Sequence, residues 1–183
     1  GATTHLLPYP NVLLPHHEGK TVEQYSFSTK TLPFFTTLHG IWYKWDEMRK
    51  DVNSLIRTIV LDKFTPEVIV GISRGGLTPG VMLSHWFQKP FKSIKAAIRD
   101  FPEWEDYLPR KSDKRILIVD DICDSGKTFQ KISNHINKNN NNADIRFASL
   151  WWNNECNFKP YYYVRECAKD SEGIWIHFPW EHW

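Results

Sequence analysis

The fold is decided by Ile116-Leu-Ile-Val-Asp-Asp-Ile-Cys-Asp-Ser-Gly-Lys-Thr128, an apolar run that passes into an acidic, glycine-containing turn. The first four residues are branched, apolar and bounded by charged residues, which predicts a buried strand. After the turn, Phe129, Ile132 and Ile136 recur at helical spacing, which predicts a helix with one apolar face. A buried strand that leads through a turn into a helix is typical of a parallel sheet covered by helices.

A second strand–turn–helix unit precedes the first. Val68–Ile72 is β-branched and is bounded by Pro66 and by Gly75-Gly76, so a buried parallel strand is expected there. Thr78-Pro79 supplies an N-cap and a proline at the first helical position, which predicts a helix over residues 79–87. The fold class indicated is α/β, a Rossmann-like parallel sheet flanked by helices on both faces.

Three parts are expected along the 183-residue chain: an N-terminal arm (1–40), a core (41–150) and a small C-terminal hood (151–183). The arm carries four of the eleven prolines and shows no sustained periodicity. In the core, apolar residues from Ile41 onward recur at three- and four-residue spacing, which predicts a helix that ends near Phe64. The tryptophans Trp42, Trp45 and Trp86 are expected on apolar helix stripes, either in the core or at a subunit interface. Further strands are expected over 93–98, 145–152 and 161–167, and a loop over 99–115.

Composition excludes several classes of protein. A formal charge of only +2 argues against a nucleic-acid-binding protein, which needs a basic excess to neutralise phosphates. No apolar run approaches the roughly 20 residues of a membrane-spanning helix. Three cysteines without a CxxC pair favour a reducing compartment, so we expect a cytoplasmic protein. The aromatic content of 15% predicts either a core rich in rings or a surface on which flat molecules stack.

The two glycine-containing turns indicate a phosphate ligand. The carboxyl ends of parallel strands meet at one edge of a sheet, and a turn that opens a helix directs backbone N–H groups at an anion. The segment Ser125-Gly-Lys-Thr128 ends like a nucleoside-triphosphate P-loop, but the required earlier glycine is replaced by Asp121. Three acids, Asp120, Asp121 and Asp124, stand before this cradle instead. Carboxylates hold hydroxyls or Mg²⁺, so the pattern suits a sugar phosphate.

The stretch 116–128 resembles the phosphoribosyl-pyrophosphate (PRPP) signature of type I phosphoribosyltransferases. The stretch 71–80 is similar to the pyrophosphate loop of the xanthine–guanine subgroup of that family. Trp42–Met48 is similar to the first helix of this subgroup, and Trp175–Glu181 to its purine-binding segment. The resemblance covers residues 41–181. It implies the type I phosphoribosyltransferase fold and a PRPP-dependent enzyme that transfers 5-phosphoribosyl to a purine, with release of pyrophosphate.

The resemblance also implies a role for individual residues. Asp124 is the expected catalytic residue, which handles a proton near purine N7 and also contacts PRPP. Trp175 is expected to stack on the purine, and the backbone of Ile176 to read its 2-position. Mg²⁺ is the expected cofactor, with Asp121 as its protein ligand. The remaining PRPP contacts are expected from the pyrophosphate loop (Ser73, Arg74, Gly75), the ribose-binding acids (Asp120, Asp121) and the 5′-phosphate cradle (Ser125, Gly126, Lys127, Thr128).

One departure from the family bears on the choice of base. Where the xanthine–guanine enzymes have a lysine that donates to the purine 6-oxygen, this chain has Asn153, with Lys159 six residues later. An asparagine can donate to a 6-oxo group or accept from a 6-amino group. Either Lys159 loops back and the base is a 6-oxopurine, or Asn153 binds the 6-position and adenine-type bases become possible. Because the C-terminal segment resembles the xanthine–guanine subgroup, we expect a 6-oxopurine (guanine, xanthine or hypoxanthine). An adenine-type or modified base and a non-catalytic PRPP-binding regulator remain as alternatives. The resemblance further implies a homodimer or homotetramer.

Overall fold

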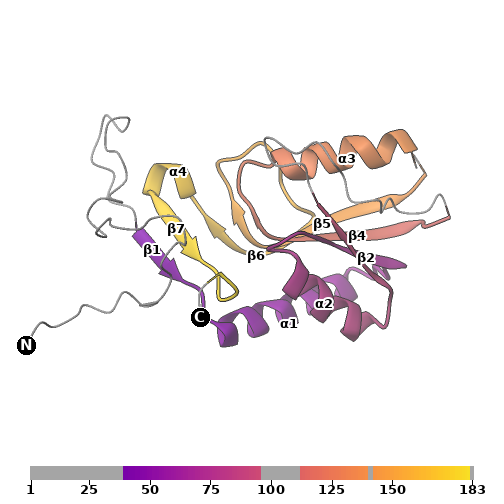
Figure 1. Ribbon diagram of the computed structural model, residues 1–183, viewed down its shortest axis with the longest axis horizontal. Coiled ribbons are helices and arrows are strands. Elements are labelled where there is room, and N and C mark those ends of the chain that lie inside the picture. Colours follow the sequence, from indigo (N-terminus) through magenta and orange to yellow (C-terminus); the bar gives the residue numbers. More distant parts are fainter. Residues whose placement is uncertain (1–38, 96–111, 140–141, 182–183) are drawn as a thin grey trace, which may run out of the picture.

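A five-stranded parallel sheet forms the centre of the molecule in a computed structural model that describes residues 39–95, 112–139 and 142–181 (Figure 1). The strand order is β3-β2-β4-β5-β6, so the two strands that precede the glycine turns are neighbours in the middle of the sheet. This arrangement confirms the α/β fold class. The strands are β2 (Val68–Ile72), β3 (Phe91–Ile94), β4 (Arg115–Cys123), β5 (Asp144–Asn153) and β6 (Tyr162–Cys167).

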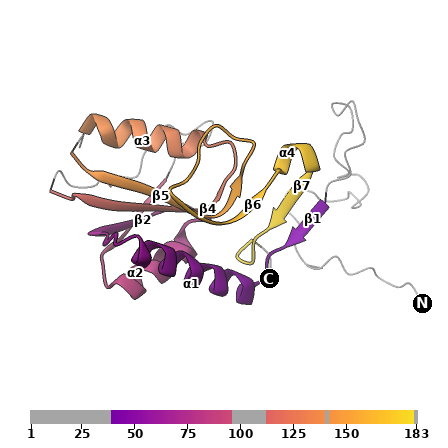
Figure 2. The same ribbon diagram turned by 180° about the vertical axis from the view of Figure 1, so that it is seen from behind.

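Helices cover both faces of this sheet (Figures 1 and 2). The helices α1 (Trp45–Leu61) and α2 (Leu77–Phe87) lie on one face, and α3 (Lys127–Asn139) lies on the other. Alternate residues of β2 point to opposite faces: Ile69 packs in the cluster of α1 and α2, whereas Val70 packs with Phe129 of α3. Because both faces of the sheet are buried, residues 68–72 of β2 and 116–119 of β4 are continuous apolar runs and do not alternate with polar residues.

A small hood stands at one end of the main sheet (Figure 2). It contains a two-stranded parallel sheet of β1 (His39–Trp42) and β7 (Ile174–His177), with the short helix α4 (Lys169–Glu172) before β7. The pairing continues past the strand, because Tyr43 N–H donates to His177 O at 3.0 Å. The prediction that the first helix begins at Ile41 is therefore wrong, and the helix begins only at Trp45.

The tryptophans expected on apolar helix stripes lie at the surface. Trp42 is on β1, is 45% exposed and stacks on the His177 ring at a centroid distance of 4.1 Å. Trp45 and Trp86 are both 54% exposed. Burial of these rings in the core is therefore ruled out, and the core is built instead from aliphatic residues and from Phe64, Phe129 and other less exposed rings.

Some predicted boundaries shift. The strand β4 continues through the acids to Cys123, because β5 runs beside it and still pairs at its end, where Cys123 is in register with Trp152. The helix α2 begins at Leu77 with Gly76 as its N-cap, so Thr78 lies inside the helix. The expected strand over 93–98 is instead β3, which ends at Ile94. Residues 1–38 of the predicted arm and most of the predicted loop over 99–115 lie outside the described residues.

A buried polar network joins the hood to the core. The Tyr43 hydroxyl donates to Asp51 Oδ2 at 2.5 Å, and Arg165 Nε donates to the same oxygen at 2.6 Å. Burial and the Asp51 carboxylate raise the pKa of Tyr43 far above its ordinary value. The network connects the start of α1 with β6, so the base of the hood is held against the sheet. No helix in the part of the chain that the structure describes has the length and apolarity to span a membrane.

Candidate active site

The turn after β2 lies against the acid pair of β4. Ser73 N–H donates to Ile94 O at 2.9 Å, which ties the turn to β3, and the Ser73–Arg74 peptide bond is cis. A Cβ atom added to Gly75 would lie 2.0 Å from Oδ2 of Asp121, so any side chain at this position would displace the carboxylate. The two predicted turns are therefore brought together at one edge of the sheet.

The adjacent carboxylates of Asp120 and Asp121 lie close together in a poorly solvated environment. Asp121 N–H donates to Asp120 Oδ1 at 2.9 Å, and Ile122 N–H donates to Asp121 Oδ1 at 2.7 Å. Burial, followed by the neighbouring charge of Asp121, raises the pKa of Asp120 well above its ordinary value. Burial likewise raises the pKa of Asp121 to about 6, and the nearby Glu181 carboxylate adds to the increase. This pair therefore resists carrying two negative charges unless a cation is near.

A cavity of about 70 Å³ lies where β4 passes into α3, and Asp124, Ser125, Gly126 and Thr128 belong to its lining. Gly126 has φ of +78°, and a Cβ atom there would lie 2.4 Å from Cβ of Phe158, so the turn requires glycine. The first N–H groups of α3, of which that of Lys127 donates to Ser125 Oγ at 3.3 Å, point toward this cavity end of the helix, and together with the helix dipole they favour an anion there. The geometry matches the cradle predicted from the sequence.

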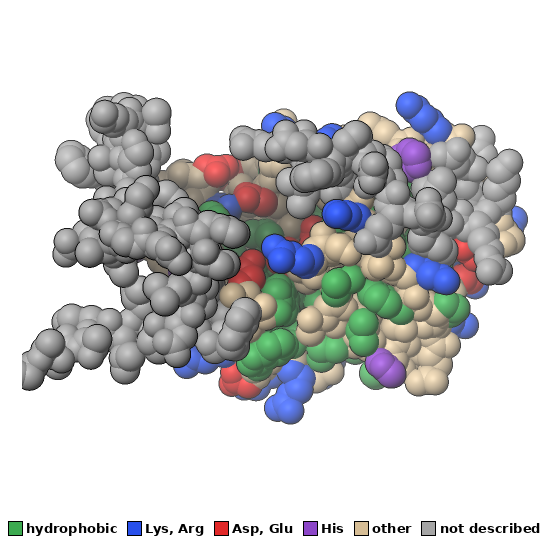
Figure 3. Space-filling view, in the orientation of Figure 1, with side chains coloured by type: hydrophobic (Ala, Val, Ile, Leu, Met, Phe, Trp, Pro, Cys, Tyr) green, Lys and Arg blue, Asp and Glu red, His purple; other side chains and the backbone are tan. Residues whose placement is uncertain are grey.

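Asp124 faces an ammonium group from the hood. Lys169 Nζ lies 2.5 Å from Oδ2 of Asp124, and the same nitrogen lies 5.1 Å from the centroid of the Trp175 ring. The Trp175 side chain is 51% exposed, so a ring face is available for stacking. Figure 3 shows acidic and basic side chains side by side around a hollow on this face of the molecule. A carboxylate, a cation and an aromatic plane thus lie within reach of one small ligand.

Asn153 is a buried connector beneath this site. Its side chain is 1% exposed, and its Nδ2 donates to the Asp124 backbone oxygen and to Asp170 Oδ2, both at 3.2 Å. Its Oδ1 accepts from the backbone N–H groups of Glu155 at 3.3 Å and Lys169 at 3.1 Å. Both polar atoms are thus engaged within the protein, and the residue links the turn after β4 to α4.

The other residues considered for the base differ in their placement. Lys159 Nζ lies over the rings of Trp152 and Tyr163, at 5.2 and 5.6 Å from their centroids. The Ile176 side chain is buried, and the residue is in register with Ile41 of β1. The backbone of Ile176 directly follows that of Trp175 in β7.

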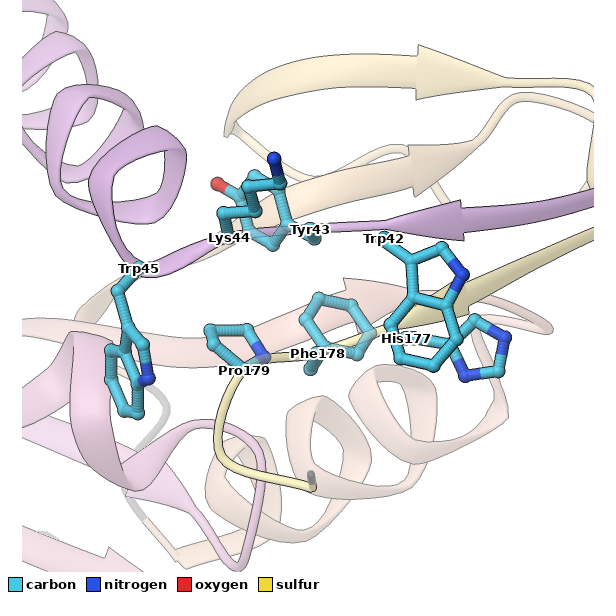
Figure 4. A pocket seen from close by; sticks show the side chains of 7 residues that line it. All are labelled: Trp42, Tyr43, Lys44, Trp45, His177, Phe178 and Pro179. Carbon is cyan, nitrogen blue, oxygen red and sulfur yellow. The ribbon is translucent and has the colours of Figure 1, made fainter. Parts of the chain in front are cut away.

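A larger cavity of about 330 Å³ lies at the base of the hood (Figure 4). Its walls come from the end of β1, the start of α1 and residues 177–179, with Trp42 stacked on His177 at one end and Trp45 at the other. None of the acids or glycine turns described above is among its lining residues. Its size alone therefore does not make it the reaction site.

The acid pair suits a hard divalent cation. Carboxylate oxygens are the ligands that Mg²⁺ prefers, and this ion is commonly held by one or two carboxylates together with substrate oxygens. Within residues 39–95, 112–139 and 142–181, no group of three or more His, Cys, Asp or Glu side chains is arranged to hold a metal. These donors therefore fit an ion that is bound by Asp120 or Asp121 on one side and by a phosphorylated ligand on the other. They do not fit a site in which protein side chains alone surround the ion.

Sequence reasoning overlooked two groups near the site. Lys169 lies in a polar segment without periodicity, and nothing local to it indicates that it reaches Asp124. Glu155 accepts from the backbone N–H groups of Asp170 at 2.8 Å and Ser171 at 3.0 Å, and thereby anchors α4. The one local signal is the sequence Lys-Asp-Ser-Glu shortly after a predicted strand, which is typical of the start of a helix.

Comparisons with known proteins agree with this geometry. Residues 42–182 match the family model of the phosphoribosyl transferase domain. The chain is 28% identical over 156 residues to xanthine-guanine phosphoribosyltransferase of Gluconobacter oxydans, with 79% of this chain and 86% of the relative covered.

Two solved structures are similar. A purine phosphoribosyltransferase from Pyrococcus horikoshii is 30% identical with a TM-score of 0.65, over 79% of this chain and 95% of that one. A Helicobacter pylori xanthine-guanine-hypoxanthine phosphoribosyltransferase is 24% identical with a TM-score of 0.69, over 78% of this chain and 94% of that one. At that identity the second likeness shows the fold alone.

Proposed function

The chain belongs to the phosphoribosyl transferase family, and from this premise we propose that it transfers the 5-phosphoribosyl group of PRPP to a 6-oxopurine. The products are then the purine nucleoside monophosphate and pyrophosphate. One observation carries the proposal: the Gly75 turn lies against Asp121, and the adjacent Asp120 lines the cavity of the anion cradle together with Ser125, Gly126 and Thr128. That contact supports binding of the pyrophosphate, ribose and 5′-phosphate of one PRPP molecule by adjacent segments.

The binding roles follow from the placement of each group. The cradle residues Ser125, Gly126, Lys127 and Thr128 hold the 5′-phosphate through backbone N–H groups at the start of α3. The carboxylates of Asp120 and Asp121 accept hydrogen bonds from the ribose hydroxyls. Arg74 is exposed beside Ser73 and Gly75, where its guanidinium can make charge-assisted hydrogen bonds to pyrophosphate.

The chemical step breaks the C1–O bond to pyrophosphate and forms a bond from C1 to a purine nitrogen. Negative charge grows on the departing pyrophosphate, and Arg74 with the N–H groups of its turn stabilises that charge. The base stacks on Trp175, which keeps the attacking nitrogen in line with C1. Asp124, whose partner Lys169 lies over this ring, accepts the proton that the purine releases.

Mg²⁺ fits the acid pair, and Asp121 is the residue that would hold it. When bound, the ion supplies positive charge to the pyrophosphate. The same charge favours the ionised form of the Asp120–Asp121 pair, whose pKa values burial raises.

The end of β5 and all of β6 belong to the main sheet, although both lie within the expected hood of residues 151–183. We propose that the hood formed by β1, α4 and β7 holds the base, and that the protein is a cytoplasmic homodimer or homotetramer. The free state of Cys123, Cys156 and Cys167 supports a reducing compartment.

The test is pyrophosphate release from PRPP and Mg²⁺ with guanine, xanthine, hypoxanthine and adenine supplied separately. We expect release with the 6-oxopurines and little with adenine. PRPP binding without release in the presence of any base would instead identify a non-catalytic regulator.

A further inference from the structure

The ammonium of Lys169 lies close to both Asp124 and the Trp175 ring. Lys169 is the first residue of α4, and its side chain is only 17% exposed, which is unusual for a lysine. Its Nζ lies 2.5 Å from Asp124 and 5.1 Å from the Trp175 ring centroid. A flat base that stacks on Trp175 with one edge toward Asp124 must therefore meet this ammonium.

The protein fixes the position from which Lys169 reaches the site. The Lys169 backbone N–H donates to the buried Asn153 at 3.1 Å, and Glu155 accepts from the next two N–H groups of α4. Asn153 also donates to the Asp124 backbone. The carboxylate and the lysine are thus attached to the same buried side chain, so their separation is set by the end of β5.

We propose that Lys169 is the residue that selects the base, by donating a hydrogen bond to the oxygen at position 6 of a purine stacked on Trp175. This inference rests on the proposed function. In the free protein the Lys169 ammonium is paired with Asp124. When the base binds, the ammonium donates to the base instead, and the Asp124 carboxylate is released from the ion pair. Asn153 then acts as a positioning residue for Asp124 and α4.

An ammonium imposes a clear chemical preference. It has three donors and no acceptor, so it pairs with a 6-oxo group and opposes a 6-amino group, which also presents hydrogens. A charge-assisted hydrogen bond of this kind contributes about 1.5–3 kcal/mol, which corresponds to about 10- to 10²-fold in affinity. Lys159, the other lysine near the end of β5, contacts the Trp152 and Tyr163 rings.

The experiment compares Lys169→Met with the matched variant Lys159→Met. Dissociation constants are measured calorimetrically for inosine monophosphate, for purine riboside monophosphate, which lacks the 6-oxygen, and for PRPP with Mg²⁺. We expect Lys169→Met to bind inosine monophosphate about 10- to 10²-fold more weakly, with little change for the other two ligands. Lys159→Met should bind all three ligands like the wild type.

Equal affinity of wild type and Lys169→Met for inosine monophosphate would overturn the inference, and a selective loss in Lys159→Met would assign the role to Lys159. The binding readout does not depend on turnover. A protein that binds inosine monophosphate through Lys169 but releases no pyrophosphate would refute the proposed reaction and support this inference. Lys169→Gln provides a second variant that removes the positive charge but keeps a polar side chain. Neither variant should prevent folding, because the Asp124 side chain is 42% exposed and its carboxylate stays hydrated when Lys169 is replaced.

Discussion

Replacing Asp121 by asparagine should make the protein more stable at neutral pH while removing its transfer activity. The carboxylate lies against the Gly75 backbone, and its Oδ1 accepts from the N–H of Ile122 at 2.7 Å. Asparagine has nearly the same shape and keeps an oxygen for this hydrogen bond. The change therefore removes a charge without opening a cavity.

The magnitude follows from the pKa of Asp121, which burial raises to about 6 from an ordinary value of 3.8. An increase of this size corresponds to about 3 kcal/mol between the two protonation states, since each tenfold change in proton affinity is about 1.4 kcal/mol. Because the folded pKa is the higher one, the folded state is favoured when Asp121 is protonated. This contribution is complete below about pH 4 and is lost as the pH rises through about 6. At pH 7.5, Asp121→Asn should therefore be more stable than the wild type by up to about 3 kcal/mol.

The assay is urea unfolding of wild type and Asp121→Asn at several pH values between 4.5 and 7.5, without Mg²⁺ or PRPP. The difference in free energy of unfolding should grow with pH and should shrink toward zero at the acidic end. Addition of Mg²⁺ should stabilise the wild type more than the variant. A difference that is independent of pH, or a variant less stable than the wild type at pH 7.5, would refute the assigned burial and charge of this pair.

Three further substitutions test other parts of the account. Gly126→Ala should destabilise the protein by about 1–3 kcal/mol in urea unfolding, because φ is +78° and the methyl group would strike Phe158; an unchanged midpoint would contradict the cradle geometry. Asp124→Ala should lower turnover by roughly 10² or more with a smaller effect on PRPP affinity, and wild-type turnover would remove this residue from the reaction. Tyr43→Phe should cost about 1 kcal/mol in unfolding free energy through loss of the hydrogen bond to Asp51, and equal stability of the two proteins would show that Arg165 alone satisfies that carboxylate.

Elements with a strong local signal were predictable from the sequence. The continuous apolar run Val68–Ile72 and the helical spacing of Phe129, Ile132 and Ile136 each lead to the observed element, because burial on a sheet face or helix face determines the pattern directly. The convergence of the two glycine turns also followed from parallel strands alone.

Features that depend on distant partners were not predictable. The strand β1 was not predicted: its first two residues fall in the expected arm and its last two in the expected helix, because its four residues alternate poorly and its pairing partner β7 lies near the other end of the chain. The acids of β4 belong to the strand because β5 extends equally far. Lys169 enters the site only through the hydrogen bonds of Asn153 and Glu155 with α4, which no local pattern reveals.

Transfer of 5-phosphoribosyl from PRPP to a 6-oxopurine is most directly tested by one competition reaction. Limiting PRPP and Mg²⁺ are incubated with the protein and an equal mixture of guanine, xanthine, hypoxanthine and adenine, and the nucleoside monophosphates are identified by mass spectrometry. We expect the nucleoside monophosphates of the 6-oxopurines to accumulate in step with pyrophosphate and adenosine monophosphate to stay a minor product. Predominant adenosine monophosphate, or PRPP that is bound but never consumed, would contradict this expectation.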